Sequence, residues 1–512
     1  MWANGRTSMP RAPEVSRRRQ LLVRADASRT LGAGHLMRTL AIADEVVHRG
    51  FDATFFMYPA QGDLRDLVRA RGHSVVAVEE MGDPVPLRRE PHSRRAAWLL
   101  VDHYSLDGTW EREARRVAAH IVAIDDLADR PHTADVVIDP NLDATDAKYR
   151  DLVGRRTALL LGPTYVPLRP EFAAARRAVG PVSARVSRIV VSMGGADPGN
   201  ATALGLAAAL EAVPEAHVHV IAGPSFAWSV DDRDPRVHVH RSPPDMASLL
   251  VGADLVVGAA GTSALERGCL GIPSVVLQLA DNQAEVAAAL ARHGMALDLG
   301  WAANLDRTTL ARAIRSLADD PERRSAMREA GMRRVDGLGA VRIANLLDGV
   351  RLRRARWSDR MLLWRWANDP QTRRFSTSTA PIPIEDHLEW LRGNLADPRV
   401  DLVIAMSGLG PVGILRLAPG WRGELEVSIN VDPQHRGGIG TLMLGAAVER
   451  WGRRFPGRVL VARIKPGNVA SERAFARTGF QRVGEYGETF VYIRPATTVA
   501  LAGGQLTQEV FP

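Results

Sequence analysis

Residues 29–38, RTLGAGHLMR, place a histidine, His35, on a glycine-rich turn between two apolar segments. The preceding segment, 20–28, predicts a strand. The following segment predicts a helix from His35 to about Arg49, with apolar residues at helical spacing: Leu36, Leu40, Ala43 and Val47. We therefore expect His35 at the carboxyl end of a strand, where open α/β sheets bind ligands and a helix start offers N–H groups to an anion. A solvated histidine at a helix start is the alternative interpretation.

Composition is that of a globular protein: 46% of the 512 residues are hydrophobic and 24% are charged. This length predicts about three domains. Cys269 is the only cysteine, which excludes an internal disulfide framework or a cysteine-based metal cluster and fits a cytoplasmic location. No run approaches the roughly 18 apolar residues of a membrane span. Residues 1–19 lack the apolar stretch of a secretory signal, and we expect a disordered tail.

The formal net charge of +8 and the isoelectric point near 10.2 raise the question of nucleic-acid binding. Lys148 and Lys465 are the only lysines, and the arginines are mixed with acidic residues throughout, with no block beyond 17–19. Anionic phosphate ligands explain a basic balance equally well. We therefore expect neither a nucleic-acid nor a membrane partner.

Short apolar segments alternate with helical ones in two successive series, which predicts parallel crossover units. The first series gives a domain over 20–175, with strands at 21–25, 52–58, 74–79, 96–102, 120–126 and 135–139. The second gives a domain over 185–348, with strands at 188–195, 217–223, 237–240, 253–261 and 273–280. The segment 171–188 predicts a helix and a Gly-Pro break between the two. The fold class is thus α/β, with two facing doubly wound Rossmann-like domains; no calcium-loop or zinc signature is present, and no metal is expected.

The third region, 351–495, has a different pattern, rich in tryptophan. Two helices accompany strands that have an antiparallel pattern, at 401–407, 412–418, 424–431 and 458–464. This predicts a smaller mixed α/β domain. Residues 496–512 are rich in Ala, Gly and Thr, and we expect a loose tail.

Glycine-bearing turns follow strands at 31–35, 192–200 and 259–266. A single such turn is a weak signal, but three at corresponding places predict one cleft in which backbone N–H groups hold a diphosphate. Around these turns, long strings resemble the pseudaminic-acid pathway hydrolases, which have the glycosyltransferase B architecture; the match covers nearly all of 20–345. The strings occupy 23–50, 124–141, 159–172, 190–200 and 259–283.

The resemblance implies that water attacks the anomeric carbon of a UDP-linked 2,4-diacetamido-2,4,6-trideoxy-altrose, without a metal, and that UDP departs. His35 matches the catalytic histidine of the family, and an imidazole is suited to accept a proton from water near neutral pH. Asp26 is the second catalytic candidate: it either orients His35 or the water, or caps the loop. Asp102 and His103 end a strand that presents them to the cleft.

The predicted substrate-binding residues are Gly34, Arg38, Arg24, Tyr104, Gly194, Gly195, Thr262, Ser263, Glu266 and Asn282. Arg38 and Arg24 are candidates to assist the leaving group, Tyr104 to contact the sugar, and Glu266 to bind the ribose hydroxyls. Local roles are the alternative for three of them, since Ser263 can cap its helix, Glu266 can complete a capping box and Asn282 can begin the next helix.

In the third region, the strand 427–431 runs into DPQHRGGIG (432–440) and then a helix, which allows backbone N–H groups to wrap a pyrophosphate. This segment and 464–480 resemble the GNAT family of N-acetyltransferases. The resemblance implies acetyl-CoA as co-substrate, with these cofactor-binding residues: Arg436, Gly437, Gly438, Gly440 and Asn468.

Two departures from the GNAT pattern put details in doubt. His435 stands where the family has Gln or Arg, and the CoA loop is one residue short. Phe475 replaces the tyrosine that protonates the leaving thiolate in many relatives, so that Tyr492 and Ser471 are the remaining weak candidates. Glu426 can accept the amine's proton through water, although a solvated strand carboxylate is the simpler interpretation. A structural domain without activity is the alternative for this region.

Together the resemblances predict a bifunctional enzyme of nonulosonic (pseudaminic) acid biosynthesis. Its third domain acetylates the 4-amino group of a UDP-sugar, and its first two domains release UDP from the product. Three alternatives remain: a glycosyltransferase that uses an acceptor in place of water, an enzyme of a related legionaminic-type pathway, and an arginine-rich nucleic-acid binder with a fused sensor domain.

Overall fold

In a computed structural model of the chain, the described residues are 19–28, 32–60, 62–79, 95–154, 157–195, 197, 199–223, 226, 228–230, 232–243, 245–407, 410–420, 424–436 and 439–495. The predicted tails at 1–19 and 496–512 lie outside these residues, except that Arg19 begins the first strand. Residues 29–31 of the glycine-rich turn also lie outside them, as do Gly437 and Gly438 of the predicted CoA loop.

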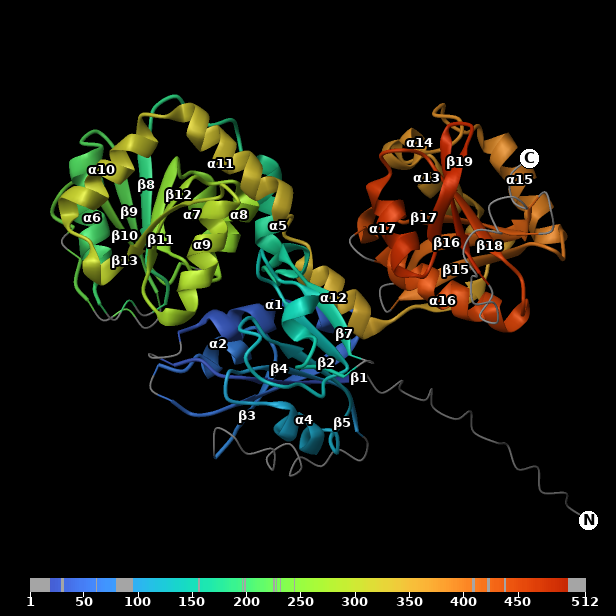
Figure 1. Cartoon of the computed structure of the whole chain (residues 1–512), viewed down its shortest axis with the longest axis horizontal. Helices are drawn as coiled ribbons and strands as arrows, with labels where there is room; N and C mark the ends of the chain where they lie inside the picture. Colours follow the sequence, from blue (N-terminus) through green and yellow to red (C-terminus); the bar gives the residue numbers. More distant parts are fainter. Residues whose placement is uncertain are drawn as a thin grey trace, which may run out of the picture.

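The first part of the chain forms a parallel sheet with helices on both faces (Figure 1). Its elements are β1 (Arg19–Ala25), α1 (Gly34–His48), β2 (Phe51–Met57), α2 (Arg65–Ala70), β3 (Ser74–Ala77), β4 (Ala96–Asp102), α4 (Gly108–Ala114), β5 (Ala118–Ile124), β6 (Val136–Asp139), η1 (Asp146–Tyr149), β7 (Ala158–Leu161) and η2 (Pro163–Tyr165). The strand order is β3-β2-β1-β4-β5-β6-β7. Leu21 and Val23 of β1 enter one core and Leu22 enters the other, which is why this strand is a continuous apolar run.

The second part repeats this architecture, with strand order β10-β9-β8-β11-β12-β13, again all parallel. Its elements are α5 (Pro170–Ala175), η3 (Arg176–Ala178), β8 (Arg188–Ser192), α6 (Ala201–Ala212), β9 (His217–Ala222), β10 (Val237–Arg241), α7 (Met246–Val251), β11 (Leu255–Ala259), α8 (Ser263–Leu270), β12 (Ser274–Gln278), η4 (Asp281–Gln283), α9 (Ala284–Arg292), β13 (Leu297–Trp301), η5 (Ala302–Asn304), α10 (Arg307–Ala318) and α11 (Pro321–Arg334). Helices α6 and α10 cover one face, and α7, α8 and α9 cover the other.

The chain crosses between the first two domains twice. Phe172 of α5 packs into the core of the second sheet with α8. After α11, helix α12 (Gly339–Asp348) returns to the first domain, where Ile343 and Leu347 join the core around α1. The Trp98 indole donates to the carbonyl of Leu347 over 2.8 Å and fixes the end of this helix. The predicted span 185–348 therefore contains a helix that packs against the first domain.

The third part is a mixed sheet of order β14-β15-β16-β17-β18-β20-β19. Its elements are β14 (Arg351–Arg354), η6 (Trp357–Asp359), α13 (Arg360–Ala367), α14 (Pro370–Arg374), α15 (Ile384–Ala396), β15 (Asp401–Ser407), β16 (Gly410–Pro419), β17 (Leu425–Val431), η7 (Pro433–His435), α16 (Ile439–Arg454), β18 (Leu460–Ile464), α17 (Val469–Arg477), β19 (Gln481–Tyr486) and β20 (Thr489–Arg494). The pairs are antiparallel except β17 with β18, which run parallel. Two parallel α/β domains followed by a mixed α/β domain confirm the predicted fold class.

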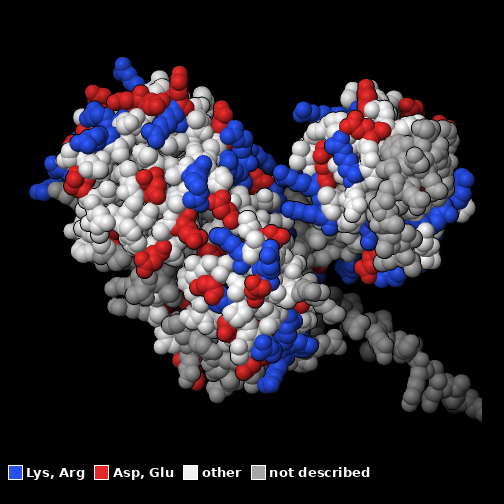
Figure 2. All heavy atoms as spheres, in the orientation of Figure 1, with Lys and Arg blue, Asp and Glu red and all other residues white. Residues whose placement is uncertain are grey.

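Lys and Arg side chains are interspersed with Asp and Glu on the molecular face in Figure 2, in small groups with uncharged areas between them. Many of these groups are paired within a few residues, as in the ion pairs Arg236–Asp234, Arg353–Asp359 and Arg399–Asp397. Among the helices of the described segments, none combines the length and the apolar character needed to cross a bilayer.

Candidate functional site

His35 lies at the amino-terminal end of α1, directly after the turn that follows β1. The helix begins at Gly34, and its N-cap residue Ala33 provides no side-chain cap. The first turn therefore has backbone N–H groups without a capping side chain, at the positive end of the helix dipole. The imidazole is 9% exposed. It is thus buried at the end of β1, and not a freely solvated group.

The imidazole is held by a buried carboxylate. The Nδ1 atom of His35 lies 2.6 Å from Oδ1 of Asp102, the last residue of β4. Arg38, one turn further along α1, donates to both oxygens of Asp102 and, over 2.6 Å, to Asp126. A carboxylate at Nδ1 favours the tautomer with the proton on that nitrogen, so that Nε2 carries the lone pair. This His35–Asp102 pair has the geometry of a general base and the group that orients it.

The charges around this pair keep Asp102 ionised. Burial raises the pKa of Asp102, but Arg38 and His35 together lower it by more, so its pKa lies well below the usual range of a carboxyl group. Burial lowers the pKa of Arg38, but Asp102 and Asp126 raise it well above its ordinary value. A cation that forms on the His35 ring would therefore face a full negative charge.

The Asp26 carboxylate binds partners other than His35. Arg24 binds both of its carboxylate oxygens, over 2.7 and 2.8 Å, and the N–H of Tyr58 donates to it. In this structure Asp102, and not Asp26, contacts the His35 ring, so we propose Asp102 for the orienting role. Residues 24 and 26 lie on the same face of an extended segment, so the guanidinium reaches the carboxylate locally. His103 approaches Asp26 to 3.3 Å and completes this separate cluster.

Two of the predicted arginines point into the protein. Arg24 is 1% exposed and uses its terminal nitrogens for Asp26 and the carbonyl of Phe56. Arg38 is committed to the two carboxylates described above. Both guanidinium groups are thus bound to buried carboxylates, and we assign Arg38 to holding Asp102 in place.

Tyr104 connects His35 with the second domain. Its ring meets the imidazole edge-on, with centroids 4.5 Å apart. The side-chain amide of Asn282, in η4, donates to its hydroxyl over 3.2 Å. Burial, followed by the charge of Asp126, raises the pKa of Tyr104 to about 12, so that its hydroxyl is protonated at neutral pH. Tyr104 and Asn282 together define where the two domains meet beside His35.

The glycine turns of the two domains approach one another at this junction. A Cβ atom on Gly34 would lie 3.6 Å from Oγ1 of Thr262, and one on Gly195 would lie 3.6 Å from the backbone nitrogen of Ala33. Gly194 has a φ of +91°, which favours glycine. The turns after β1, β8 and β11 thus converge, as the sequence predicts from their positions at strand ends.

Helix α8 begins at this junction and contains a buried arginine, Arg267. Thr262, its N-cap residue, makes no side-chain cap. Arg267 is 2% exposed, and its hydrogen bonds are all to neutral acceptors: the carbonyl of Ala259 and the hydroxyls of Ser263 and Ser274. Burial lowers its pKa to about 10, against the influence of the neighbouring acid. The helix start and this buried cation together favour an anion.

The remaining predicted residues of the second domain have local partners. Ser263 accepts from Arg267, and Glu266 lies 3.7 Å from Arg169. Burial raises the pKa of Glu266 above its ordinary value, although Arg169 and Arg267 oppose it. The sequence did not predict Arg267 as a site residue, because no motif distinguishes it from the many other arginines of the chain.

In the third domain, β17 and β18 separate. They pair only at Leu425↔Leu460 and Glu426↔Val461, although β17 continues to Val431 and β18 to Ile464. Past these two pairs, the facing strand edges are not bonded to each other. An extended ligand with amide groups can hydrogen-bond to such edges.

Three of the predicted cofactor residues, Arg436, Gly440 and Asn468, lie in the described segments that follow β17 and β18. Gly440 is in the first turn of α16, which follows β17. Arg436 donates to Gln371 over 2.6 Å and also pairs with Asp369, both in the α14 region. The side chain of Asn468 caps α17 by accepting from the N–H of Ser471.

The positions considered for proton transfer in this domain have different surroundings. Phe475 is buried edge-on against Phe480 in the core. Tyr492 is also in this core, and burial raises its pKa. Glu426 forms an ion pair of 2.8 Å with Arg463 across the two separating strands. In the part of the chain that the structure describes, no group of three or more His, Cys, Asp or Glu has metal-binding geometry.

Comparison with known proteins assigns the two halves separately. Residues 350–481, in the third domain, match the family model of the Acetyltransferase (GNAT) domain. The N-terminal part is homologous to the spore coat polysaccharide biosynthesis protein SpsG of Bacillus subtilis, 26% identical over 335 residues, which are 64% of this chain and 97% of SpsG. It is also homologous to the UDP-2,4-diacetamido-2,4,6-trideoxy-beta-L-altropyranose hydrolase of Campylobacter jejuni, 26% identical over 154 residues, 30% of this chain and 53% of that protein.

An uncharacterized protein of Methanocaldococcus jannaschii is 22% identical over 279 residues, 52% of this chain and 57% of that protein. The chain thus spans little more than half the length of two of these three relatives. Among solved structures, MurG of Acinetobacter baumannii is similar over 64% of this chain and 99% of its own, with 15% identity and a TM-score of 0.46. The aminoglycoside acetyltransferase AAC(6')-Ib in complex with coenzyme A is similar over 28% of this chain and 94% of its own, with 21% identity and a TM-score of 0.26.

Proposed function

We propose that the first two domains hydrolyse a UDP-linked 2,4-diacetamido-2,4,6-trideoxy-altrose to the free sugar and UDP, and that the third domain supplies this substrate by acetylating the 4-amino group of its precursor with acetyl-CoA. The observation that carries the proposal is the buried His35–Asp102 contact at the junction of the two domains. The similarity to the Campylobacter hydrolase supports the reaction, and the GNAT domain supports the acetyl transfer.

In the proposed hydrolysis, Nε2 of His35 accepts a proton from water as the water oxygen attacks the anomeric carbon. Asp102 holds the proton on Nδ1 and stabilises the imidazolium that forms. Arg38 keeps the Asp102 carboxylate in place. Positioned general-base catalysis of this kind contributes about 10²–10⁴-fold to a rate.

The bond between the anomeric carbon and the diphosphate oxygen breaks, and the electron pair leaves with UDP. We assign the diphosphate to the start of α8 and the turn at Gly194 and Gly195, where backbone N–H groups and the buried charge of Arg267 favour it. In the same proposal Glu266 binds the ribose, and Tyr104 and Asn282 contact the sugar. Thr262, Ser263 and Gly34 line the diphosphate.

In the proposed acetyl transfer, the separated edges of β17 and β18 hold the amide groups of the pantetheine arm. The start of α16, with Arg436 and Gly440, holds the pyrophosphate of the cofactor. The sugar amine attacks the thioester carbon, an N–C bond forms, and the C–S bond breaks to release CoA. Phe475 has no proton to give, so the leaving sulfur takes its proton from another source.

Hydrolysis is tested with the purified chain, the UDP-linked diacetamido sugar and ¹⁸O-labelled water, followed by mass spectrometry. We expect ¹⁸O in the free sugar and none in UDP. The His35→Asn variant should release UDP at least about 100-fold more slowly. The matched control is His48→Asn, at the exposed end of the same helix, which should retain activity. Label in UDP, or a donor that stays intact without an added acceptor, would contradict the proposal.

A further inference from the structure

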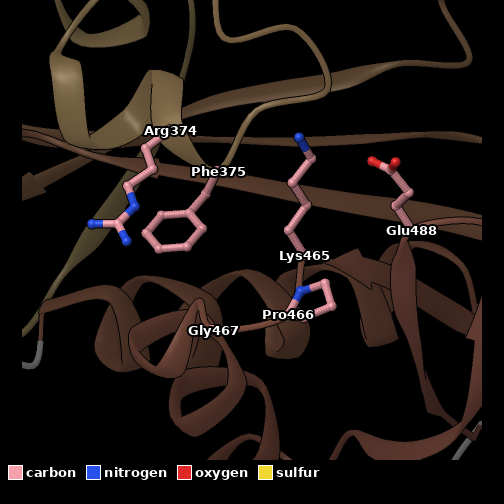
Figure 3. Close-up of a pocket in the computed structure, with 6 residues that line it drawn as sticks. All are labelled: Arg374, Phe375, Lys465, Pro466, Gly467 and Glu488. Atoms are coloured by element: carbon pink, nitrogen blue, oxygen red, sulfur yellow. The ribbon is translucent and has the colours of Figure 1, made fainter.

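Two further groups of polar side chains lie outside the residues assigned so far. One lines a hollow of about 550 Å³ in the third domain, to which Arg374, Lys465 and Glu488 contribute (Figure 3). Because Lys465 directly follows β18, this hollow belongs to the region already assigned to acetyl transfer. The other group is a set of four histidines on the second domain, which neither proposed reaction uses.

The four histidines, His217, His219, His238 and His240, lie on one face of two neighbouring strands. β9 begins with His-Val-His-Val, and β10 begins with Val-His-Val-His. Because side chains alternate along a strand, the valines enter the core and the histidines face the other way. His219 lies opposite His238 in the parallel register, and β10 is the edge strand of this sheet.

The four imidazoles form two pairs across the strands. Nδ1 of His217 lies 2.9 Å from Nε2 of His238, and Nδ1 of His219 lies 2.9 Å from Nε2 of His240. The rings of each pair are stacked, with centroids 5.1 and 5.2 Å apart, and the rings of His219 and His238 are 4.7 Å apart. Several other histidines of the chain, such as His132, bind carboxylates, whereas these four contact one another.

Solvent and small ions have access to this face of the sheet. His217 is exposed, and the other three residues are half-buried. A neutral imidazole has one N–H group and one lone pair, so a single N–H···N hydrogen bond joins the rings of each pair. A cation that binds both facing nitrogens can replace that hydrogen bond.

The distance within each pair fits two ligands of one metal ion. Imidazole nitrogen is a common ligand of Cu²⁺, Ni²⁺ and Zn²⁺, and a bond from zinc to this nitrogen is about 2.0–2.1 Å long. With bonds of this length, two nitrogens at right angles are about 2.9 Å apart, whereas two at the tetrahedral angle are about 3.4 Å apart. The separation of 2.9 Å therefore fits adjacent positions of a square-planar or tetragonal shell, which is typical of Cu²⁺ and Ni²⁺.

The surroundings of the four histidines disfavour hard cations. Arg188 of β8 lies opposite His217 in the register, and its guanidinium donates to the carbonyl of Leu249 in α7. Its positive charge acts on His219 and His240 as well. Ca²⁺ and Mg²⁺ require oxygen ligands, which these rings do not offer, and the arginine repels ions that bind through charge alone. An ion that bonds to imidazole nitrogen is therefore the matching class.

We propose that the His217–His238 and His219–His240 pairs form a binding face for Cu²⁺ or Ni²⁺, in which an ion takes two imidazole nitrogens from the protein and its other ligands from water. The ring that donated the hydrogen bond shifts its proton to its other nitrogen, so that both facing nitrogens offer a lone pair and neither ring loses a proton. Two protein ligands suffice, in agreement with the absence of larger metal-binding groups from the described segments. The bound ion ties the edge strand β10 to β9, and the inference is independent of both proposed reactions.

The test titrates Cu²⁺ or Ni²⁺ into the full chain, prepared without a histidine tag. The electron paramagnetic resonance spectrum of bound Cu²⁺ should show hyperfine splitting from two imidazole nitrogens. Ni²⁺ at 100 times its Kd should raise the unfolding temperature of the second domain by about 5 °C, because it binds the folded state alone. Mg²⁺ and Ca²⁺ should produce no such shift.

Two double variants remove one ring from each pair, on different strands. Both His217→Gln/His219→Gln and His238→Gln/His240→Gln should weaken Cu²⁺ binding at least about tenfold and abolish the shift with Ni²⁺. Unfolding without metal establishes that each variant is folded, and His48→Gln, at the exposed end of α1, is the matched control with unchanged binding. Unchanged Cu²⁺ binding in either folded double variant, or failure of both ions to bind the wild type at millimolar concentration, would overturn the proposal.

Discussion

Replacing Asp102 by Asn isolates the contribution of one buried charge to hydrolysis. The amide keeps the shape of the carboxylate. With its oxygen at the Oδ1 position it still accepts from His35 and from one Arg38 nitrogen, but its NH2 group then meets the Arg38 Nε–H that Oδ2 binds, and the negative charge is lost. At 2.6 Å between the hydrogen-bonded atoms, the charge centres of an imidazolium and the carboxylate are about 4 Å apart, which is worth about 4 kcal/mol at an effective dielectric constant of about 20. We therefore expect UDP release to slow by about 10³-fold.

The matched control is Asp26→Asn. Asp26 is buried, like Asp102, and also binds an arginine, Arg24. In the described parts of the chain, its other contacts are with Tyr58 and His103 and not with His35. Both variants should unfold at lower temperature than the wild type, because each removes a carboxylate from a buried guanidinium. UDP release at saturating substrate should fall less than about tenfold in Asp26→Asn. Equal rate losses in the two variants, or a loss below tenfold in Asp102→Asn, would refute the assignment of Asp102.

Three further predictions concern stability and the glycine junction. Burial lowers the pKa of His132, but Asp125 and Glu111 raise it to about 9. The pairing of the protonated ring with these carboxylates therefore stabilises the fold below pH 6.5, and this stabilisation is lost as the pH rises through 9. Urea unfolding of Glu111→Gln at pH 7 should show that the free energy of unfolding falls by about 3–5 kcal/mol. Burial, followed by the surrounding positive charges, lowers the pKa of His219 to about 4. The free energy of unfolding should therefore fall as the pH drops from 6.5 to 4, and it should fall less steeply with pH in His219→Gln. A Cβ atom on Gly223 would lie 2.6 Å from the Cα atom of Gly195, so Gly223→Ala should displace that turn and raise KM for the UDP-sugar; an unchanged KM would count against the diphosphate assignment.

The sequence predicts the alternation of strands and helices well, because strands buried on both faces are continuous apolar runs. The helix expected from His35 to Arg49 is confirmed within one residue at each end. Two strands at sheet edges, β7 (Ala158–Leu161) and β13 (Leu297–Trp301), were missed, whereas the edge strands β3 and β10 were predicted. The two missed strands are short and only half buried, so their apolar signal is weak.

The contact between His35 and Asp102 was predicted only in part, for a reason that lies in the order of strands. His35 is recognisable from its turn, but Asp102 reaches it because β4 lies next to β1, with Asp102 in register with Ala25. The sequence predicts both strands but not their neighbours in the sheet. The sequence analysis therefore considered Asp26, which is close to the turn, for the orienting role that we propose for Asp102.

The two proposed reactions require opposite surroundings, and the structure provides them in separate domains. Hydrolysis needs one activated water and a base whose proton is held, which suits the buried pair of His35 and Asp102. Acetyl transfer needs an extended cofactor beside its acceptor, which suits the separated edges of β17 and β18. This contrast explains why consecutive reactions on one sugar would be divided between two sites on the same chain.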